Sequence, residues 1–359
     1  MLSGDGLIVR VRPRLARLTA AQIRVLAEGA LAYGTGLIDL TNRANLQLRG
    51  INLAETEPLL LRLAAADLLD VDAEAEGRRN VLCAPDWEDG DDTHSLTLEL
   101  NRRLAELPLL PAKFSFVIDA GQTLALATEP ADLRIERGRS GGLILRAGRS
   151  ARGAVVSAGD AVGALIALAH WVMSTGSTGR IAHLQTLSDP PGWARPEELP
   201  ANSAARPVPG RVSRGLYVGF AFGRIPAQSL LALPPVAVRL TPWRLVLLEG
   251  VSQVPAVAGA IVDACDRLLA VDACPGAPDC AAASVPTRDI AASLRLPAGK
   301  SLHVSGCTKG CARAKPAEVT LVGREGRFDV VTNGCAWDMP VLRGLLPENI
   351  SGALDALYL

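Results

Sequence analysis

The stretch IDLTNRANLQLRGI, residues 38–51, aligns without gaps on VRLTPWRLVLLEGV, residues 238–251, and this internal match is the main indication of the fold. Identical residues coincide at four pairs of positions: Leu40/Leu240, Thr41/Thr241, Leu48/Leu248 and Gly50/Gly250. The first copy is predicted to form two short strands, at about 36–41 and 46–51. We therefore expect the same pair of strands to occur twice in the chain.

The segments that precede the two copies correspond as well. GLIVRV at 6–11 matches GLYVGF at 215–220, and a predicted helix follows each of these strands, the second one at 226–233. The repeated order strand–helix–strand–strand indicates an internal duplication. Chance alignment of short apolar strands is the alternative, and the shared order of elements argues against it. Two such units can pair into one sheet around a pseudo-twofold axis.

Local signals mark the predicted helices. Thr19, with Gln22 three residues later, forms a capping-box pattern, so a helix is expected to begin after Thr19. The apolar face of this helix is formed by Ile23, Leu26, Ala27, Ala30 and Leu31. Another helix is expected at about 54–67, and a third, capped by Asp160, at about 161–174. Residues 188–214 are rich in proline and poor in periodicity, which predicts an extended linker.

Composition bounds the class of protein. The chain has 359 residues, 49% of them apolar, and a formal net charge of zero. This length predicts two or three domains, and the neutral balance provides no long-range field toward nucleic acid or membrane. The N-terminal residues MLSGDGLIVR show no signal-peptide pattern, and the apolar run at 161–173 is shorter than the roughly 20 residues that span a bilayer. We therefore expect a cytoplasmic protein.

Four of the seven cysteines form a pattern. CPGAPDC holds Cys274 and Cys280, and CTKGC holds Cys307 and Cys311. Four thiolates from two loops can hold structural zinc or a 4Fe–4S cluster. Structural zinc usually has two to four residues between paired ligands, whereas a five-residue loop spans a larger object, so the spacing favours the cluster. The neighbouring glycines, Gly276, Gly306 and Gly310, allow the backbone to approach closely.

The other cysteines lack partners at ligand spacing. Cys83, Cys265 and Cys335 are predicted to be buried, inert thiols. In a reducing compartment, seven cysteines argue against a disulfide framework and for metal or cluster chemistry.

With this cysteine pattern and the duplicated half, the sequence resembles the sulfite and nitrite reductases. Three basic segments carry the resemblance further: TNRANLQLRG around Arg43, GRRNVLCAP around Arg79, and LPAKF around Lys113. In that family a siroheme shares the last cysteine, here Cys311, with a 4Fe–4S cluster, and the basic segments cover the siroheme face.

The resemblance implies an α+β, sulfite/nitrite reductase-like fold. A duplicated ferredoxin-like half-domain pair forms one domain, and two further α/β domains surround a central cleft. The boundaries that we predict are 1–70 for the first half-domain, 71–187 for an α/β domain that binds substrate or cofactor, 188–214 for the linker, 215–255 for the second half-domain, and 256–359 for the iron–sulfur cluster domain.

One departure distinguishes branches of the family. The sulfite-reducing pattern has a second lysine where KFSF places Ser115, and a missing cation weakens stabilisation of a developing oxyanion. Nitrite reductases also lack that lysine. The short chain, the segment HVSGCTKGCARAKPAEVTLVGREGRFDVVTNG and KFSFVID look most similar to precorrin-3B synthases, the oxygen-dependent monooxygenases of aerobic cobalamin biosynthesis.

This resemblance implies a reaction and its components. Precorrin-3B synthases hydroxylate a meso carbon of precorrin-3A and close a γ-lactone from a neighbouring acetate. They carry a 4Fe–4S cluster and a mononuclear non-haem iron, and siroheme is not required. The implied partners are precorrin-3A, dioxygen and an external electron donor, with no nucleic acid and no membrane. A pocket that holds siroheme as a cofactor in the reductases can hold another tetrapyrrole as a substrate.

Cationic side chains are the candidate substrate anchors, because guanidinium groups bind carboxylates bidentately. The candidates are Arg43, Arg49, Arg79 and Lys113, with solvated surface charge as the alternative for each. Near the cluster, Lys309, Arg313 and Lys315 are expected either to offset the negative charge of thiolate-ligated iron or simply to be solvated.

The ligands of a mononuclear iron are not assigned from the sequence. Such irons commonly use two histidines and a carboxylate, and the chain has only His94, His170, His183 and His303. His170 is expected to pack in the core, and His303 to lie on a strand that leads into the cluster loop. No catalytic residue is assigned. Two other functions remain open: a siroheme-dependent nitrite or sulfite reductase, and a non-catalytic iron–sulfur electron carrier.

Overall fold

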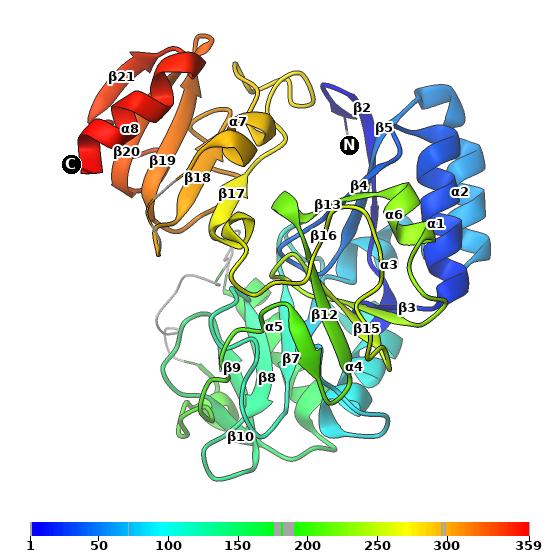
Figure 1. Cartoon of the computed structure of the whole chain (residues 1–359). Coiled ribbons are helices and arrows are strands. Elements are labelled where there is room, and N and C mark those ends of the chain that lie inside the picture. Colours follow the sequence, from blue (N-terminus) through cyan, green and yellow to red (C-terminus); the bar gives the residue numbers. More distant parts are fainter. Residues whose placement is uncertain are drawn as a thin grey trace.

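The duplication predicted from the sequence is present element by element. The computed structural model describes residues 2–70, 72–175, 181, 190–295, 297 and 299–358, which form four β-sheets with helices packed on them (Figure 1). The first half-domain contains β1 (Leu2–Ser3), β2 (Gly6–Val11), the 3-10 turn η1 (Arg14–Ala16), β3 (Arg17–Leu18), α1 (Ala20–Tyr33), β4 (Leu37–Leu40), β5 (Leu46–Ile51), η2 (Leu53–Glu55) and α2 (Thr56–Ala65). The second contains β11 (Gly210–Val212), β12 (Gly215–Phe220), η5 (Ala221–Gly223), β13 (Arg224–Pro226), α6 (Ala227–Leu231), β14 (Val238–Leu240), β15 (Leu245–Glu249) and β16 (Ala260–Ile261).

Equivalent turns in the two half-domains share unusual backbone angles. The turn between β4 and β5 has Ala44 at a φ of 52°, and the turn between β14 and β15 has Arg244 at 63°. Gly50 and Gly250 have φ values of 66° and 69°. Glycine adopts this left-handed region without steric cost, which explains why glycine stands at both positions.

The half-domains exchange one strand each, so the expectation of a single sheet is wrong. The first sheet has the order β1-β2-β5-β4-β13 and the second the order β11-β12-β15-β14-β3. The tight turns η1 and η5 send β3 and β13 out of their own sheets, and each then pairs with the edge of the other sheet. Both sheets share one hydrophobic core, which includes Leu48 of the first half-domain and Leu248 of the second.

The capping box of α1 is confirmed. The Gln22 N–H donates to Thr19 Oγ1 (3.2 Å), and the Thr19 N–H donates to Gln22 Oε1 (3.0 Å). Four of the five predicted face residues are buried, whereas Leu31 is 43% exposed because it lies at the edge of that face.

A second body lies between the half-domains in sequence. It contains α3 (Ala73–Arg78), β6 (Val81–Cys83), α4 (Asp92–Arg102), η3 (Leu104–Glu106), β7 (Phe116–Asp119), β8 (Leu133–Arg137), β9 (Leu143–Ala147), β10 (Ala154–Val156) and α5 (Ala161–Ser174). Its sheet has the order β10-β9-β8-β7-β6, in which β6, β7 and β8 are parallel. Its buried apolar side chains form a separate core that packs α4 and α5 against the strands.

Two predictions about α5 need correction. Asp160 precedes the helix as expected, but its carboxylate accepts from Ser157 Oγ (2.6 Å) rather than from a first-turn amide. His170 is exposed, because it lies on the side of α5 where its Nε2 hydrogen-bonds the Glu106 carbonyl (2.8 Å), and not in the core.

Residues 190–214 run in an extended path, apart from the turn η4 (Gly192–Ala194) and β11. They lie along the second body through isolated bridges, at Gly138 with Pro200 and at Gly153 with Glu198. The first two residues of the predicted linker, 188 and 189, fall outside the described residues.

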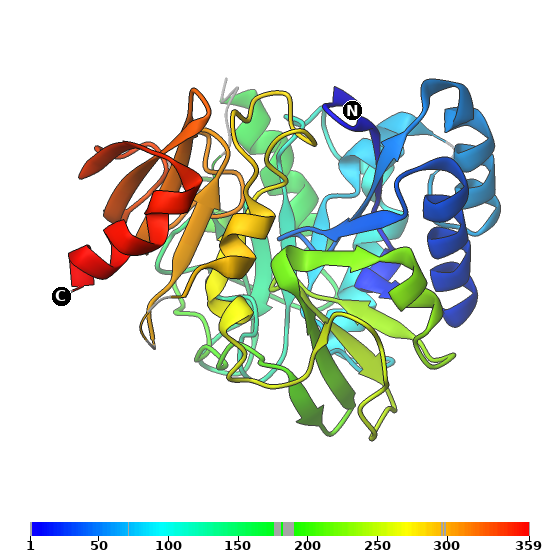
Figure 2. The ribbon, with the colours of Figure 1, turned by 45° about the horizontal axis from the view of Figure 1, so that its top comes forward.

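The C-terminal body consists of one mixed sheet and its helices. It contains η6 (Arg267–Ala270), β17 (Val271–Ala273), α7 (Arg288–Ser293), β18 (Leu302–Ser305), β19 (Ala317–Arg324), β20 (Arg327–Gly334), β21 (Leu342–Leu345), η7 (Pro347–Asn349) and α8 (Ile350–Tyr358). β17, β18 and β19 are parallel neighbours. The segment that follows β17, drawn in yellow, reaches toward the N-terminal strand β2 (Figure 1, Figure 2). In the part of the chain that the structure describes, none of the helices has the length and apolar character needed to cross a bilayer.

Candidate functional site

The two cysteine loops leave the same edge of the C-terminal sheet. Cys274 directly follows β17, and Cys307 follows β18 by two residues. β17 and β18 pair in parallel, with Ala273 opposite Val304. Because parallel strands end at the same edge of a sheet, the loops that carry Cys274 and Cys307 begin side by side.

The four sulfurs share one region of space. Burial raises the pKa of Cys311, and the nearby Cys307, Cys274 and Cys280 raise it further, while Lys309 lowers it. Exposure increases across the set: Cys274 is buried, Cys280 and Cys307 are half-buried, and Cys311 is exposed. A thiol whose pKa is raised by neighbouring thiols is the kind of group that a bound cation would deprotonate.

The backbone around these thiols suits an iron–sulfur cluster. The Gly306 N–H donates to Cys274 Sγ (3.2 Å), the type of bond that tunes cluster sulfurs. Gly276 has a φ of 74°, and a Cβ there would lie 2.6 Å from Thr287 Oγ1. A Cβ at Gly306 would lie 2.5 Å from Ala283 Cβ. Gly276 is therefore required by close packing within the first cysteine loop, and Gly306 by the packing of the second loop against the first.

Ligands of a cluster need not converge on one point. Among the described residues, no group of three or more His, Cys, Asp or Glu side chains is arranged to coordinate a single metal ion. In a 4Fe–4S cluster each cysteine binds a different iron, so the four sulfurs lie farther apart than the ligands of one zinc ion. The four-cysteine assignment therefore stays a prediction that fits the loop geometry.

Two of the three basic segments are in direct contact. Arg43 Nη1 and Nη2 lie 3.5 and 3.4 Å from the Lys113 carbonyl oxygen. Arg43 is on the β4–β5 turn, and Lys113 lies three residues before β7. The third segment is adjacent, because Asn80 Nδ2 donates to the Phe114 carbonyl (2.6 Å). The fold thus brings the Arg43, Arg79 and Lys113 segments together.

The side chains of Arg79 and Lys113 differ in exposure. Arg79 is buried and forms ion pairs with Asp70 (3.1 Å) and Glu76 (2.5 Å), whereas Lys113 is exposed. Arg79 Nη1 is buried without a hydrogen-bond partner among the described residues. Lys113 and Arg43 are therefore better placed than Arg79 to meet a bound anion.

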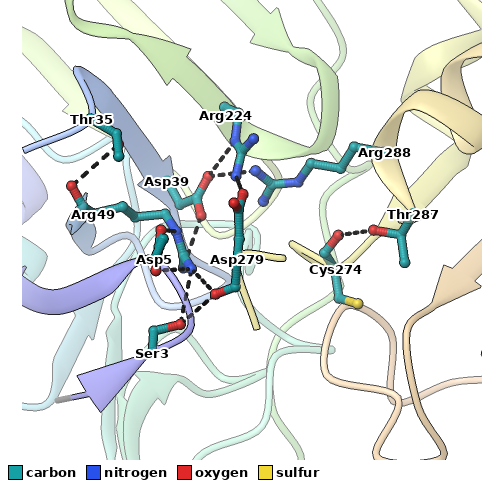
Figure 3. Close-up of polar contacts among 10 residues, drawn as sticks. All are labelled: Ser3, Asp5, Thr35, Asp39, Arg49, Arg224, Cys274, Asp279, Thr287 and Arg288. Atoms are coloured by element: carbon teal, nitrogen blue, oxygen red, sulfur yellow. Dashed lines mark hydrogen bonds and ion pairs between the residues drawn. The ribbon is translucent and has the colours of Figure 1, made fainter. Parts of the chain in front are cut away.

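Arg49 lies in an internal ionic network (Figure 3). Its side chain is 3% exposed, and its Nε and Nη2 donate to both carboxylate oxygens of Asp5 (2.9 and 3.0 Å). Arg49 Nη2 also donates to the Asp279 carbonyl (3.0 Å), in the loop between Cys274 and Cys280. Its contacts in the structure thus join the first half-domain to the cysteine loop.

The three basic residues beside the second cysteine loop differ in their contacts. Arg313 Nη1 pairs with Asp272 Oδ2 (2.9 Å), and its Nη2 donates to the Pro316 carbonyl (2.8 Å). Lys309 and Lys315 are exposed, and the Lys309 charge acts on the pKa of Cys311. Lys309 is thus the member of the three whose charge acts on a thiol of the set.

Comparisons with known proteins identify the family. Residues 1–66 match the family described as nitrite/sulfite reductase ferredoxin-like half domain. The chain is 31% identical to the precorrin-3B synthase of Sinorhizobium sp., over 95% of this chain and 82% of that protein. The chain belongs to the precorrin-3B synthase family. It is therefore an enzyme of an oxidoreductase family.

More distant relatives place the precorrin-3B synthase family within a larger fold group. The chain is 33% identical to the ferredoxin–nitrite reductase of Synechococcus elongatus, over 35% of this chain and 27% of that enzyme. The structure of the Mycobacterium tuberculosis NirA protein superimposes with a TM-score of 0.62 at 19% identity, covering 98% of this chain and 80% of that one. The α+β, sulfite/nitrite reductase-like fold predicted from the sequence is confirmed.

The histidines of this precorrin-3B synthase family member are dispersed. His94 stacks on Trp87 (ring centroids 4.9 Å apart), and its Nδ1 accepts from the Gly90 N–H (3.0 Å). His303 lies on β18, as predicted, and is fully buried. His183 lies outside the described residues. The described residues thus do not form the two-histidine, one-carboxylate group that a mononuclear iron would require.

Of the three cysteines outside the four-cysteine pattern, two are buried and one is exposed. Cys83 and Cys335 are buried, and burial raises the pKa of Cys83 to about 12, which makes it inert. Cys265 is exposed, so its predicted burial is wrong. The reason is local: the Cys265 N–H donates to Asp263 Oδ1 (2.9 Å) in a polar turn ahead of η6.

The Ser115 side chain points inward. The Ser115 N–H and Oγ donate to Asp132 Oδ2 (2.8 and 3.2 Å), and both residues are buried. The bonds between Ser115 and Asp132 therefore join the start of β7 to the start of β8. A serine at this position adds no positive charge near Arg43 and Lys113.

The acidic residues of the ionic network could not be identified from the sequence. Asp39 on β4 accepts from Arg288 (3.0 Å) and Arg224 (3.4 Å), and Asp279 accepts from Arg224 (2.9 Å). Only Asp279 carried a signal, because it stands beside Cys280 in CPGAPDC. The other members come from distant segments that no local pattern connects.

Proposed function

We propose that this chain is the oxygen-dependent monooxygenase that converts precorrin-3A to precorrin-3B, by hydroxylation of a meso carbon and formation of a γ-lactone, in aerobic cobalamin biosynthesis. The observation that carries the proposal is the match to a precorrin-3B synthase over 95% of this chain. A monooxygenase places one oxygen atom of dioxygen in its product and reduces the other to water. The reaction therefore needs two electrons and two protons, which an external donor and solvent supply.

In this proposal, Arg43 and Lys113 bind the carboxylates of the substrate. Precorrin-3A has acetate and propionate side chains around its ring, and guanidinium groups pair with carboxylates through two parallel hydrogen bonds. Arg43 comes from the first half-domain and Lys113 from the second body, so their contact forms a cationic border where these bodies meet. Arg79 is held by Asp70 and Glu76, and its neighbour Asn80 joins this segment to Phe114, beside Lys113.

Cys274, Cys280, Cys307 and Cys311 are the residues proposed to hold a 4Fe–4S cluster. Such a cluster supplies electrons one at a time when it is bound. The protein's contribution is to keep the loops close through Gly276 and Gly306, to donate the Gly306 N–H to a sulfur, and to place the Lys309 charge near Cys311. A mononuclear iron is part of the resemblance, but the described residues offer no ligand set for it, and no step is assigned to it.

A siroheme-dependent nitrite or sulfite reductase is the second candidate function. The nitrite reductase relatives favour it, and so does the exposure of Cys311, the position that the reductases share with siroheme. Ser115 argues against the sulfite activity, because its hydroxyl is engaged by Asp132 and adds no positive charge. A third possibility, a non-catalytic electron carrier, gives no reason for Arg43 and Lys113 to lie together.

The test uses anaerobically purified protein incubated with precorrin-3A, a chemical reductant and ¹⁸O-labelled dioxygen. Mass spectrometry of the pigment should show the gain of one labelled oxygen atom. Arg43→Gln should weaken pigment binding roughly ten-fold or more, the usual effect of losing one bidentate carboxylate contact. Arg139→Gln, at an exposed arginine in the β8–β9 turn, is the matched control.

The outcomes separate the candidates. Pigment that gains no oxygen contradicts the monooxygenase assignment. Siroheme absorption in the purified protein, together with nitrite-dependent oxidation of the reductant, supports the reductase instead. Protein that neither binds pigment nor consumes dioxygen, yet holds a redox-active cluster, supports the carrier.

A further inference from the structure

We propose that Arg49 and Arg224 are positioning residues that hold the loop of Cys274 and Cys280 against the first half-domain. The inference rests on the proposed role of these cysteines as cluster ligands. It gives Arg49 a different role from substrate binding, and it assigns a role to Arg224, which the sequence pattern did not single out.

The contact point is Asp279, the residue before Cys280 (Figure 3). Its carbonyl oxygen accepts from Ser3 Oγ (2.6 Å) and from Arg49 Nη2 (3.0 Å). Its carboxylate Oδ2 accepts from Arg224 Nη2 (2.9 Å). We call the three donors, Ser3, Arg49 and Arg224, the Asp279 clamp. They belong to β1, β5 and β13, which are all strands of the first sheet.

The two arginines of the clamp are themselves fixed in place. Both carboxylate oxygens of Asp5 hold Arg49, whose side chain is 3% exposed. Asp39 lies within ion-pair distance of both arginines, at 3.5 Å from Arg49 Nη1 and 3.4 Å from Arg224 Nε. Because the carboxylates of Asp5 and Asp39 orient their donors, the arginines can hold Asp279 in one position rather than follow its motion.

The same network reaches the other end of the cysteine loop. Asp39 Oδ1 accepts from Arg288 Nη1 (3.0 Å), at the first residue of α7. The preceding residue, Thr287, donates its Oγ1 to the Cys274 carbonyl (2.5 Å). The first half-domain therefore contacts the loop near both of its cysteines. One contact is at Asp279, next to Cys280, and the other is at Arg288, next to Thr287, which binds the Cys274 carbonyl.

Close packing accompanies these bonds. A Cβ at Gly4, in the β1–β2 turn, would lie 2.2 Å from the Pro278 carbonyl oxygen. The hairpin therefore lies directly on the loop, at a distance that only glycine allows.

Restraint of the loop matters because Cys274–Thr287 contains no helix or strand in the structure. Holding such a segment in its bound conformation lowers the entropy that cluster binding must otherwise remove. The clamp thus favours cluster retention without touching the cluster. Loss of the clamp should make the loop more mobile and the cluster easier to lose.

The chain provides a matched control at the equivalent arginine of the other half-domain. Arg17 on β3 lies opposite Arg239, as Arg224 on β13 lies opposite Asp39. Arg17 donates two hydrogen bonds to Glu249 (2.8 and 2.9 Å), which lies on β15 of the second sheet and outside the cysteine loop. Arg17→Gln and Arg224→Gln therefore remove comparable charge-assisted bonds, but only the second removes a bond to the cysteine loop.

Two measurements test the proposal on the full-length protein. In reconstituted protein, cluster loss to an iron chelator is followed by visible absorption. In cluster-free protein, hydrogen exchange is followed at the amides of Ala277, Cys280 and Ala283, which are hydrogen-bonded within the loop. Arg224→Gln should accelerate both processes roughly ten-fold, as expected for one lost charge-assisted bond, and Arg17→Gln should change neither. Ser3→Ala, which removes a neutral donor, should act in the same direction with a smaller effect.

Circular dichroism and thermal melting confirm that each variant is folded. Wild-type rates in Arg224→Gln overturn the proposal, and so does equal acceleration in Arg224→Gln and Arg17→Gln, which would reflect general destabilisation. A wild-type protein that cannot hold a cluster contradicts the ligand assignment, while the exchange measurement still decides whether the clamp restrains the loop.

Discussion

Asp39 and Arg239 occupy equivalent positions in the two half-domains and carry opposite charges. Each pairs with the equivalent residue of the neighbouring strand, Asp39 with Arg49 and Arg239 with Glu249, so the ion pair is reversed between the copies. The exchanged strands each add an arginine to the acid of the pair: β13 adds Arg224 to Asp39, and β3 adds Arg17 to Glu249. Each sheet thus has an ion pair between the same two strand positions, with the charges reversed.

The inversion gives the two half-domains different partners. Asp39, an acceptor, receives Arg288 from the C-terminal body. Arg239, a donor, gives hydrogen bonds to the carbonyls of Pro85 (2.9 Å) and Trp87 (2.6 Å), and its guanidinium lies 3.7 Å from the centre of the Trp87 ring. The first sheet therefore holds the cysteine loop, and the second sheet holds the segment after β6.

Replacing Arg239 should destabilise the fold without affecting the cluster. Arg239→Met leaves Glu249 with one arginine and removes the contacts to Trp87 and Pro85, and the side chain is 5% exposed. Breaking a buried ion pair from one side typically costs about 3–5 kcal/mol, because the remaining charge stays buried. Arg17 still pairs with Glu249, so we expect the free energy of unfolding, measured by denaturant titration, to fall by about 3 kcal/mol. The iron content should equal that of the wild type, and a loss of iron would contradict the division of roles between the two ion pairs.

Removal of Cys311 should abolish the cluster. Cys311 is the most exposed of the four cysteines, and the other three lie near enough to raise its pKa, so Cys311→Ser would leave three ligands for the cluster. Iron and sulfide per chain should fall to a small fraction of the wild-type values, with loss of the broad visible absorption. Cys265→Ser provides the control, because Cys265 is also exposed but lies outside the ligand pattern. Unchanged iron content in Cys311→Ser would contradict its assignment as a ligand.

The stability of the protein should fall in mild acid because of His303. Burial lowers the pKa of His303 from 6.5 to about 4, with Asp272 opposing the shift. Between those pH values the unfolded chain binds a proton that the folded chain does not, so stability decreases as pH falls through this window. The full difference is about 3 kcal/mol at most.

His303→Leu should remove this dependence. Neither ring nitrogen has a hydrogen-bond partner among the described residues, so an apolar side chain of similar size should be neutral or slightly stabilising at pH 7.5. At pH 5 the variant should be clearly more stable than the wild type, as measured by denaturant midpoints at both values. Parallel pH profiles for the two proteins would show that His303 is not the titrating group.

The sequence predicted the duplication and the cysteine loops because both depend on local patterns. Strand pairs, capping residues and ligand spacing are determined by neighbours along the chain. The exchange of β3 and β13 could not be predicted in the same way, because these strands have two and three residues and pair with edges of the other half-domain. Arg49 was ambiguous for a similar reason: its partners, Asp5 and the Asp279 carbonyl, come from separate segments that only the folded chain brings together.

A pair of glycine substitutions can separate backbone strain from packing at the cysteine loops. Gly276 and Gly259 have nearly the same φ, 74° and 76°, so alanine at either position carries a similar backbone cost of about 1 kcal/mol. At Gly259 an added Cβ meets no atom within 4 Å, whereas at Gly276 it lies 2.6 Å from Thr287 Oγ1 and 2.8 Å from the Thr287 nitrogen.

Gly276→Ala should therefore push apart the two ends of the cysteine loop, because Thr287 also holds the Cys274 carbonyl. We expect Gly259→Ala to lower the melting temperature slightly and to keep the full iron content. Gly276→Ala should lose most of its cluster and should be destabilised by more than the backbone cost alone. Equal melting temperatures and equal iron content in the two variants would mean that the loop can move Thr287 aside, and that close approach of the backbone at Gly276 does not determine the cluster site.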